Sequence, residues 1–439
     1  MKAFWKGFGI AILVGVVGGS ALFVWPYVRI RRDNKQSLGA SRTTMAPLIP
    51  QKTKEELIKD AMERSSTIRG LYMTADVAND PGRGATRLRE RIIHLADTTE
   101  INGIVIDVKE VCGPDYNEAR LKNLVDELHQ KNIWAIARIV SFKDASQRLA
   151  HPEWYLGRHA HKATGEGCIT KRGLTTPSTA LQESGKILWQ DNKGGYWMDP
   201  AADGARGYIA RIGRDMIDLG FDELQFDYVR FPSDGDVSQA VYPVWDKKTP
   251  KHEVLKKFFA GLHDELVAYK PDIILSADLF GYVATQGEDI GIGQRVEDIG
   301  SSFNYLSFMV YPSHYYNGLQ LPADSVRNLP AVSLNVAGAR AHPDVIVGRS
   351  LLAAEDFLDG RATTSDSTIT AAPLEENSVR ARIRPWLEDF FHEQDRLAGR
   401  PWGAEKVRMQ IDAAEQASGH GWMLWNASNV YSDAALHKE

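Results

Sequence analysis

The sequence predicts a (β/α)8 TIM barrel with a long insertion after its third strand. Two observations support this fold class: strand-like and helix-like segments alternate from about residue 67 onward, and a strand is predicted eight times. The predicted strands are residues 69–78, 103–111, 134–142, 223–231, 273–283, 305–315, 382–390 and 421–431. An open doubly wound sheet is the alternative, but it usually carries a glycine-rich phosphate turn after its first strand, which this sequence lacks there.

Each predicted strand is an apolar, β-branched or aromatic run bounded by turn-forming residues. The predicted helices repeat apolar residues at helical spacing. They span residues 83–98, 118–131, 200–219, 251–269, 294–300, 344–358 and 403–417. Asp199 is the expected N-cap of the third helix, with Pro200 in its first turn. The connection of residues 143–198 is too long for a simple loop and rich in Gly, His and Trp, which indicates a functional insertion.

Composition and charge exclude several classes of function. The net charge of −5 and a pI near 6.2 give no basic footprint, so no nucleic-acid partner is expected. Cys112 and Cys168 form no CxxC motif; one bridge is open to them, but burial as small hydrophobic side chains is favoured. Three nearby histidines, His151, His159 and His161, lack a further ligand at a regular spacing, so no metal site is predicted.

The amino-terminal part of the chain differs from the rest. Residues 7–28 carry no charge and are long enough to cross a bilayer, so we expect a single-pass signal-anchor within residues 1–30; a cleaved signal peptide is the alternative. Residues 31–66 read as a linker with a short helix at 54–64, either free or docked on the domain formed by residues 67–439. The flanking charges slightly favour a cytoplasmic domain, whereas the function favours an extracytoplasmic or periplasmic one, which we predict.

The segment 221–235 (FDELQFDYVRFPSDG) is the most informative in the chain. Side chains alternate along a strand, so Gln225, Asp227 and Val229 are expected to share one face. An ionised carboxylate is rarely buried without a partner or a function. Asp227 is therefore expected either to pair with Arg230 or another cation, or to face a cavity at the carboxyl end of its strand.

Acidic residues recur where the predicted strands end. They are Asp76, Asp107, Glu110, Asp227, Asp278, Glu388 and Asp389, while strands six and eight end in Tyr311, Ser313, His314, Trp425, Asn426 and Ser428. Because the active site of a TIM barrel lies at this end, carboxylates, aromatic rings and amides there indicate a sugar site. Structural alternatives remain: Lys109 can pair with Asp107, Asp278 can cap a turn, and only one of the acids in strand seven can point inward.

The motifs VIDVKE, IARIVSFKD, YWMDP, GFDELQFDYVRFPSDG, SADLFGY, MVYPSHY, RPWLEDF and GWMLWNASN, in this order over residues 67–435, resemble a bacterial family of glycoside hydrolases of unknown specificity. Its barrels are distantly similar to those of α-amylases and α-galactosidases. The resemblance implies catalytic carboxylates at Asp227 and Asp278 and a third acid at Asp389. The sequence departs from the α-amylase pattern twice, because Gln225 stands where an Arg is usual and the strand-five acid is Asp rather than Glu.

These observations predict a glycosidase, of the retaining type, acting on a poly- or oligosaccharide of the cell envelope or an exported glycan. Asp227 would be the nucleophile and Asp278 the acid and base, with no nucleotide, flavin or metal cofactor. The predicted substrate-binding residues are Asp107, Lys109, Trp197, Arg230, Tyr311, His314, Trp386, Trp425 and Asn426. The alternative is a membrane-tethered carbohydrate-binding protein on an inactive barrel. Two catalytic acids facing one open cleft favour the enzyme, and an acid sealed by a cation favours the binding protein.

Overall fold

The computed structural model describes most of the chain from residue 52 onward. The described residues are 52–158, 187–287, 289–361, 381–390, 392, 396–397, 399 and 402–438. The predicted anchor, most of the linker, the middle of the insertion and residues 362–380 lie outside them. Among the described residues no helix is long and apolar enough to cross a membrane.

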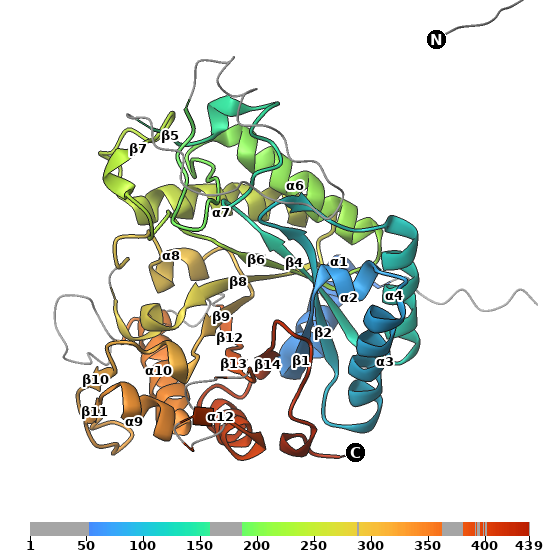
Figure 1. Ribbon diagram of the computed structural model, residues 1–439, viewed down its shortest axis with the longest axis vertical. Helices are drawn as coiled ribbons and strands as arrows, with labels where there is room; N and C mark the ends of the chain where they lie inside the picture. The colour runs from blue at the N-terminus through green and yellow to red at the C-terminus, as the bar shows by residue number, and fades with distance from the viewer. Residues whose placement is uncertain are drawn as a thin grey trace, which may run out of the picture. The chain divides into compact units, whose positions relative to one another are not determined.

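Eight parallel strand positions, all within the described residues, close into a barrel (Figure 1), so the predicted TIM barrel is confirmed. In order around it are β1 (Ile68–Met73), β2 (Gly103–Glu110), β4 (Trp134–Val140), β6 (Glu223–Asp227), β8 (Ile274–Phe280), β9 (Tyr305–Met309), β13 (Trp386–Glu388) and β14 (Gly421–Trp425). β12 (Arg382–Ile383) shares the seventh position with β13. Short antiparallel pairs are β3 (Gly113–Pro114) with β2, β5 (Gly157–Arg158) with β7 (Ala240–Val241), and β10 (Leu319–Leu321) with β11 (Val332–Leu334).

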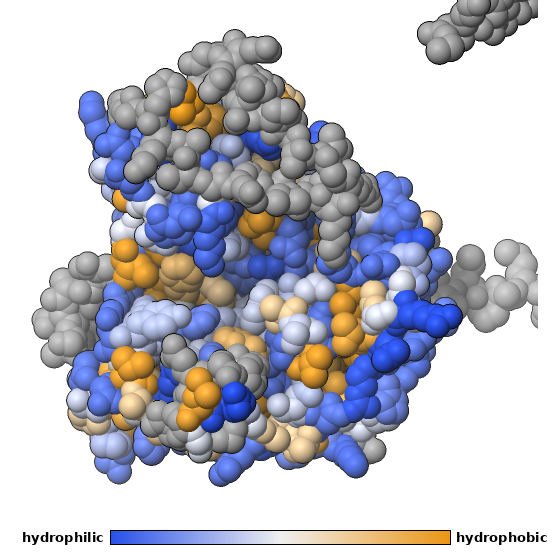
Figure 2. Space-filling model, in the orientation of Figure 1, coloured by the Kyte–Doolittle hydropathy of each residue, from blue (hydrophilic) through white to orange (hydrophobic). Residues whose placement is uncertain are grey.

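Helices surround the strands in Figure 1 and bury their apolar faces against them. They are α2 (Ala75–Asn79), α3 (Arg83–Thr98), α4 (Glu118–Gln130), α6 (Asp203–Asp218), α7 (Lys251–Tyr269), α8 (Val296–Gly300), α9 (Val336–Ala341), α10 (Pro343–Leu358) and α12 (Ala404–Ala417). On the face drawn in Figure 2, apolar side chains form separate patches among hydrophilic ones.

Several predicted boundaries were wrong, chiefly because the strands are shorter. Asp76 lies in α2 rather than at the end of β1. Tyr228 has a φ of +52°, which ends β6 at Asp227 and breaks the alternation that was expected to continue to Val229. Asp199 is not an N-cap, because α6 begins at Asp203 and the Asp199 carboxylate instead accepts hydrogen bonds from backbone N–H groups of residues 201, 244 and 245.

Cys112 is disulfide-bonded, so the favoured expectation of a buried free thiol was wrong at this position. Cys168, the other cysteine of the chain, lies outside the described residues.

The short helix predicted before the domain is α1 (Lys54–Arg64), and it is docked on the barrel. The Arg64 guanidinium lies 5.0 Å from the ring of Trp134, and the hydroxyls of Ser65 and Tyr305 are 2.9 Å apart. Trp134 and Tyr305 are the first residues of their strands, so α1 covers the amino-terminal end of the barrel.

A buried ion pair between Arg384 and Glu223 lies inside the barrel, at the end that α1 covers. The Arg384 guanidinium lies 2.9 Å from the Glu223 carboxylate, and both side chains are fully buried. Ser276 and Trp134 also donate to Glu223, and the Tyr305 ring lies 3.8 Å from the guanidinium. Every carboxylate oxygen is thus partnered, which compensates for the loss of water.

Replacing Arg384 by Met is expected to lower the free energy of unfolding by about 3–5 kcal/mol, because the Glu223 carboxylate would stay buried without a counter-charge. Denaturant titration followed by circular dichroism measures the change. Adding Glu223→Gln should restore part of the loss, since no buried charge then remains. An Arg384→Met variant as stable as the parent protein would contradict this account.

Candidate active site

The two acids predicted to be catalytic lie on neighbouring strands and line one cavity. Asp227 is the last residue of β6, Asp278 lies near the carboxyl end of β8, and these strands are paired in the barrel. The cavity has a volume of about 640 Å³. Asp227 is 7% exposed and Asp278 is 2% exposed, so each carboxylate meets solvent only through the cavity.

Arg138 of β4 joins these acids. Its guanidinium contacts Asp227 through one terminal nitrogen and Asp107 through the other, the latter at 2.5 Å, and its Nε lies 3.7 Å from Asp278. Arg138 is paired in register with Gln225, two residues before Asp227, so it supplies the cation beside Asp227 from the neighbouring strand. The sequence analysis missed it, although a charged residue inside the apolar run WAIARIV was the available signal.

Asp107 is the second carboxylate that the Arg138 guanidinium contacts. It accepts hydrogen bonds from Arg138 and from the Tyr72 hydroxyl, is fully buried, and is not among the described residues that line the cavity. The expected partner Lys109 pairs instead with Asp144 at 2.7 Å, because the β2–β4 register shifts between residues 107 and 109. The structure therefore places Asp107 and Lys109 behind the cavity wall, not in contact with a substrate.

The two acids have different environments. The Trp386 indole donates a 2.8 Å hydrogen bond to Asp278. Burial, and then the negative charge of Asp227, raise the pKa of Asp278 well above its usual range. Asp227 instead accepts hydrogen bonds from Arg138 and from the backbone N–H of Tyr228. Tyr228 is the first residue after β6 and has a positive φ. The raised pKa favours the protonated form of Asp278, whereas Asp227 is held by a cation and a backbone donor.

Aromatic side chains form much of the cavity wall. Four predicted residues lie there: Tyr311, His314, Trp386 and Trp425. The sequence analysis missed others, which follow strand ends or lie in the insertion: Lys193, Tyr228, Phe280, Gly281, Tyr282, Met309, Tyr315 and Tyr316. Tyr228 directly follows the predicted acid Asp227, and Tyr315 and Tyr316 follow the predicted residue His314, so position after a strand end was the usable signal.

Arg230 also lines the cavity, but its expected pairing with Asp227 was wrong. Its guanidinium lies 4.8 Å from the ring of Trp197 and 4.6 Å from that of Phe280. Trp197 is itself buried and is not among the described lining residues, so it supports Arg230 from behind.

Two further predicted residues point away from the cavity. Asp389 accepts hydrogen bonds from the backbone N–H and hydroxyl of Ser432, both at 2.7 Å, and burial raises its pKa to about 6. Asn426 donates to the carbonyls of Asp389 and Val430. Glu388, the neighbouring acid, is fully buried and accepts from the backbone N–H of Ser313. Neither strand-seven acid is solvated, contrary to expectation, and the structure does not bring Asp389 to the other two acids.

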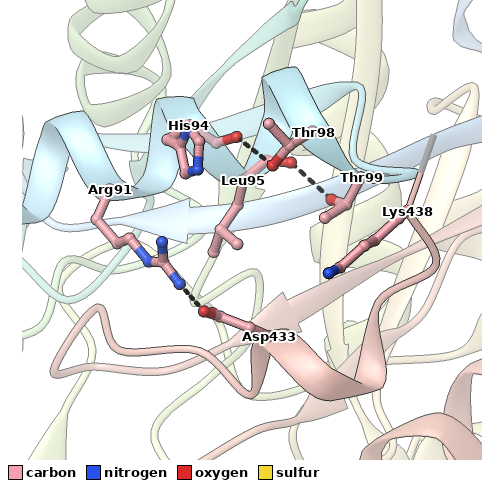
Figure 3. A pocket seen from close by; sticks show the side chains of 7 residues that line it. All are labelled: Arg91, His94, Leu95, Thr98, Thr99, Asp433 and Lys438. Atoms are coloured by element: carbon pink, nitrogen blue, oxygen red, sulfur yellow. Dashed lines mark hydrogen bonds and ion pairs between the residues drawn. The ribbon is translucent and has the colours of Figure 1, made fainter.

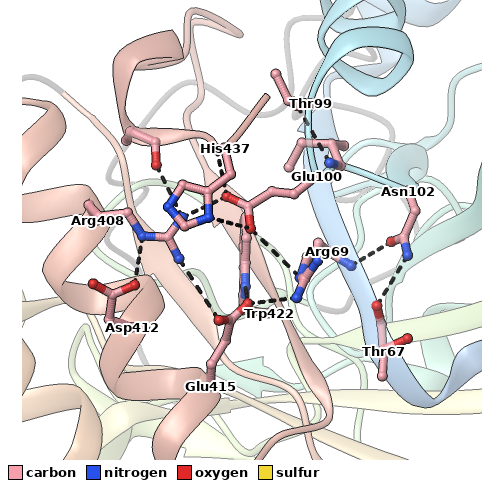
Figure 4. Close-up of polar contacts among 12 residues, drawn as sticks. Thr67, Arg69, Thr99, Glu100, Asn102, Arg408, Asp412, Glu415, Trp422 and His437 are labelled. Atoms are coloured by element: carbon pink, nitrogen blue, oxygen red, sulfur yellow. Dashed lines mark hydrogen bonds and ion pairs between the residues drawn. The ribbon is translucent and has the colours of Figure 1, made fainter. Parts of the chain in front are cut away.

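A second cavity, of about 430 Å³, lies between α3 and the carboxyl-terminal segment (Figure 3). It is bordered by an ion pair between Arg91 and Asp433. Next to it, Glu100 lies 2.6 Å from Arg408 and accepts a 2.9 Å hydrogen bond from the His437 backbone (Figure 4). Glu100 precedes β2, so this region is at the amino-terminal end of the strands, where TIM barrels build stability rather than active sites.

Several solved structures are similar to the chain. A hypothetical protein from Ruminiclostridium thermocellum ATCC 27405 is 26% identical, with 47% of this chain and 96% of that chain covered and a TM-score of 0.35. The PgaB (BpsB) glycoside hydrolase domain from Bordetella bronchiseptica is 13% identical over 83% of this chain and 95% of that one, with a TM-score of 0.48. An α-galactosidase from Thermus thermophilus is 12% identical over 82% and 58%, with a TM-score of 0.43.

No curated protein matches the sequence. A family model described as "Putative glycosyl hydrolase domain" matches residues 70–167 and 169–431, which is more than half of the chain and includes both cavity acids and Arg138. The protein therefore belongs to this family of glycosyl hydrolase domains, as the motifs in its sequence predicted.

Proposed function

We propose that the protein is a retaining glycoside hydrolase in which Asp227 is the nucleophile and Asp278 the general acid and base. One observation carries this proposal: two carboxylates on adjacent strands line one cavity but lie in different environments. Asp278 has a raised pKa, whereas Asp227 contacts a buried guanidinium. Such a divided pair is what acid and nucleophile roles require.

In the first step Asp278 donates its proton to the glycosidic oxygen as the bond to the anomeric carbon breaks. The Asp227 carboxylate attacks that carbon and forms a covalent glycosyl-enzyme. In the second step the Asp278 carboxylate removes a proton from water, the water oxygen attacks the anomeric carbon, and Asp227 leaves as a carboxylate. Arg138 stabilises the ionised form of Asp227 at the start and end of this cycle. The aromatic wall offers ring faces on which sugars stack.

We place the domain on the extracytoplasmic side of a membrane, tethered by residues 7–28, with an envelope or exported glycan as its substrate. Two features support this placement. The amino-terminal segment is uncharged and long enough to span a bilayer. Cys112 is disulfide-bonded, and disulfides persist mainly in oxidising compartments.

A second candidate function is glycan binding without catalysis. It is favoured by the observation that both oxygens of Asp227 already have partners, Arg138 and the Tyr228 backbone. A bound sugar would then stack in the cavity without attack at its anomeric carbon. Glycan binding by the parent protein without any released product would support this function over the enzyme.

Asp227→Asn is expected to reduce turnover by roughly a thousandfold or more, which corresponds to about 4 kcal/mol of transition-state stabilisation. Reducing-sugar release from a panel of oligosaccharides measures it. Asp264→Asn, which removes an exposed carboxylate on α7, is the matched control and should leave turnover unchanged. Undiminished turnover in Asp227→Asn would refute the nucleophile assignment.

For the best substrate of that panel, kcat/KM is expected to fall as pH rises through the pKa of Asp278, because only the protonated carboxyl donates to the leaving group. Since this pKa is raised, the fall should occur at a higher pH than for an ordinary Asp. Asp278→Asn should abolish this alkaline limb and spare aryl glycosides with good leaving groups. An unchanged alkaline limb in Asp278→Asn would rule out this role.

Reporter fusions at the carboxyl terminus test the placement. A reporter that is active only outside the cytoplasm, such as a periplasmic phosphatase, should be active, and one that fluoresces only in the cytoplasm should be dark. The fusion lacking residues 1–30 is the control and should show the reverse pattern. Activity of the full-length fusions only in the cytoplasm would contradict the placement.

A further inference from the structure

We propose that the cavity contains an anion subsite formed by Arg230 and Lys193, and that the substrate is therefore an acidic glycan whose sugar carries a carboxylate or a sulfate. This inference rests on the proposed glycosidase function, which it extends by naming a substrate class. It arises from the charges of the cavity wall rather than from the catalytic acids.

Arg230 is a buried cation that has no counter-ion among the described residues. Only 7% of it is exposed, and it lines the cavity. Its hydrogen bonds within the described part of the chain go to uncharged acceptors, the Phe231 carbonyl and the Ser233 hydroxyl, both at 3.1 Å. The charges of nearby acids act on it only at longer range. A guanidinium buried in this way is costly unless an anion reaches it.

Aromatic rings hold this guanidinium in place. Trp197, Phe280 and Tyr228 lie 4.8, 4.6 and 5.3 Å from its central carbon. The Trp197 indole is fixed in turn by a 2.9 Å hydrogen bond to Asp191. Asp191 itself is neutralised by a described lysine, so it is not available to Arg230. A fixed, planar guanidinium fork binds carboxylate and sulfate oxygens in pairs with little loss of side-chain entropy.

Lys193 adds a second positive charge from a different part of the chain. It lies in the insertion after β4, lines the same cavity, and its exposed side chain makes no ion pair with a described residue. Its backbone N–H donates a 3.0 Å hydrogen bond to Asp191, the residue that also holds Trp197. The Lys193 backbone and the Trp197 ring, which packs against Arg230, therefore both donate hydrogen bonds to the Asp191 carboxylate.

The charges of the neighbouring residues offset only part of the charge of these two cations. By formal charge, Arg138 and the two carboxylates that it contacts, Asp107 and Asp227, leave one negative charge against the two positive charges of Arg230 and Lys193. The pKa of Asp278 is raised, which keeps that side chain largely uncharged. A neutral glycan would leave Arg230 buried and unpaired, whereas an anionic substituent would pair with it. Electrostatic complementarity therefore favours an acidic substrate.

Calorimetric titration of the full-length protein in detergent tests this inference, with Asp227→Asn present to prevent hydrolysis. The carboxylate probes are oligosaccharides of galacturonate, alginate and hyaluronate, the sulfate probes are carrageenan oligosaccharides, and the neutral probes are cello-, malto- and chito-oligosaccharides. At least one acidic series should bind tenfold or more tightly than every neutral series, and its affinity should fall with added salt. The carboxylate and sulfate arms identify which anion is preferred.

Matched variants assign the effect to the subsite. Arg230→Gln should lower acidic-glycan affinity at least tenfold and Lys193→Gln about threefold, while neutral-glycan affinity stays unchanged. Arg230→Lys keeps the positive charge but loses the planar pair of N–H donors. It should therefore bind acidic glycans more tightly than Arg230→Gln and less tightly than the parent site. Lys193 is exposed, so its variant tests the proposal even if Arg230→Gln fails to fold.

Equal or tighter binding of neutral glycans, no binding of any acidic probe, or acidic affinity unaffected by both variants would overturn the inference. The proposed function fails separately. Hydrolysis of neutral glycans alone would keep the glycosidase and remove the anion subsite. Acidic-glycan binding without hydrolysis by the parent protein would keep the subsite and remove the catalytic assignment.

Discussion

The contact of one buried guanidinium with three acidic residues is the constraint on which the site depends. Arg138 touches Asp107, Asp227 and Asp278, which come from three different strands. Carboxylates this deeply buried would repel one another and take up protons without that charge. Because the cation lies closer to Asp227 than to Asp278, the two acids have different electrostatic environments, and burial raises the pKa of Asp278. The same contacts fix β4 against β2 and β6.

Polar side chains lie inside the barrel at both ends and in the middle, beside an apolar cluster, and the two ends use them differently. At the amino-terminal end the Glu223–Arg384 pair is sealed, and α1 packs over the first residues of the strands. Gln225 occupies the middle, where it donates to Ser307. At the carboxyl end Asp227 faces a cavity. Residues 223, 225 and 227 follow the strand alternation, so one five-residue strand carries both a sealed, ion-paired carboxylate and the proposed nucleophile.

The proposed catalytic groups and the proposed recognition groups come from different parts of the fold. The paired acids and Arg138 lie on barrel strands, whose hydrogen-bonded register holds them rigidly. Most of the aromatic wall and both unpaired cations of the cavity, Arg230 and Lys193, lie in segments that follow strands. TIM barrels commonly divide these roles in this way: residues at the strand ends carry out the reaction, and the loops determine which substrate binds.

The sequence by itself determined the strand and helix order, the barrel and the shared face of residues 223, 225 and 227, because hydrophobic periodicity and side-chain alternation are local properties of the chain. The family followed from the resemblance of its motifs. The sequence also identified Asp227 and Asp278, since strand ends meet at one rim. Only the tertiary structure decided which charges pair. Asp227 pairs with Arg138 rather than with Arg230, and Lys109 pairs with Asp144 rather than with Asp107. Asp389 accepts a hydrogen bond from Ser432. These choices depend on register shifts, a positive φ at Tyr228 and the paths of loops, which bring together residues far apart in sequence.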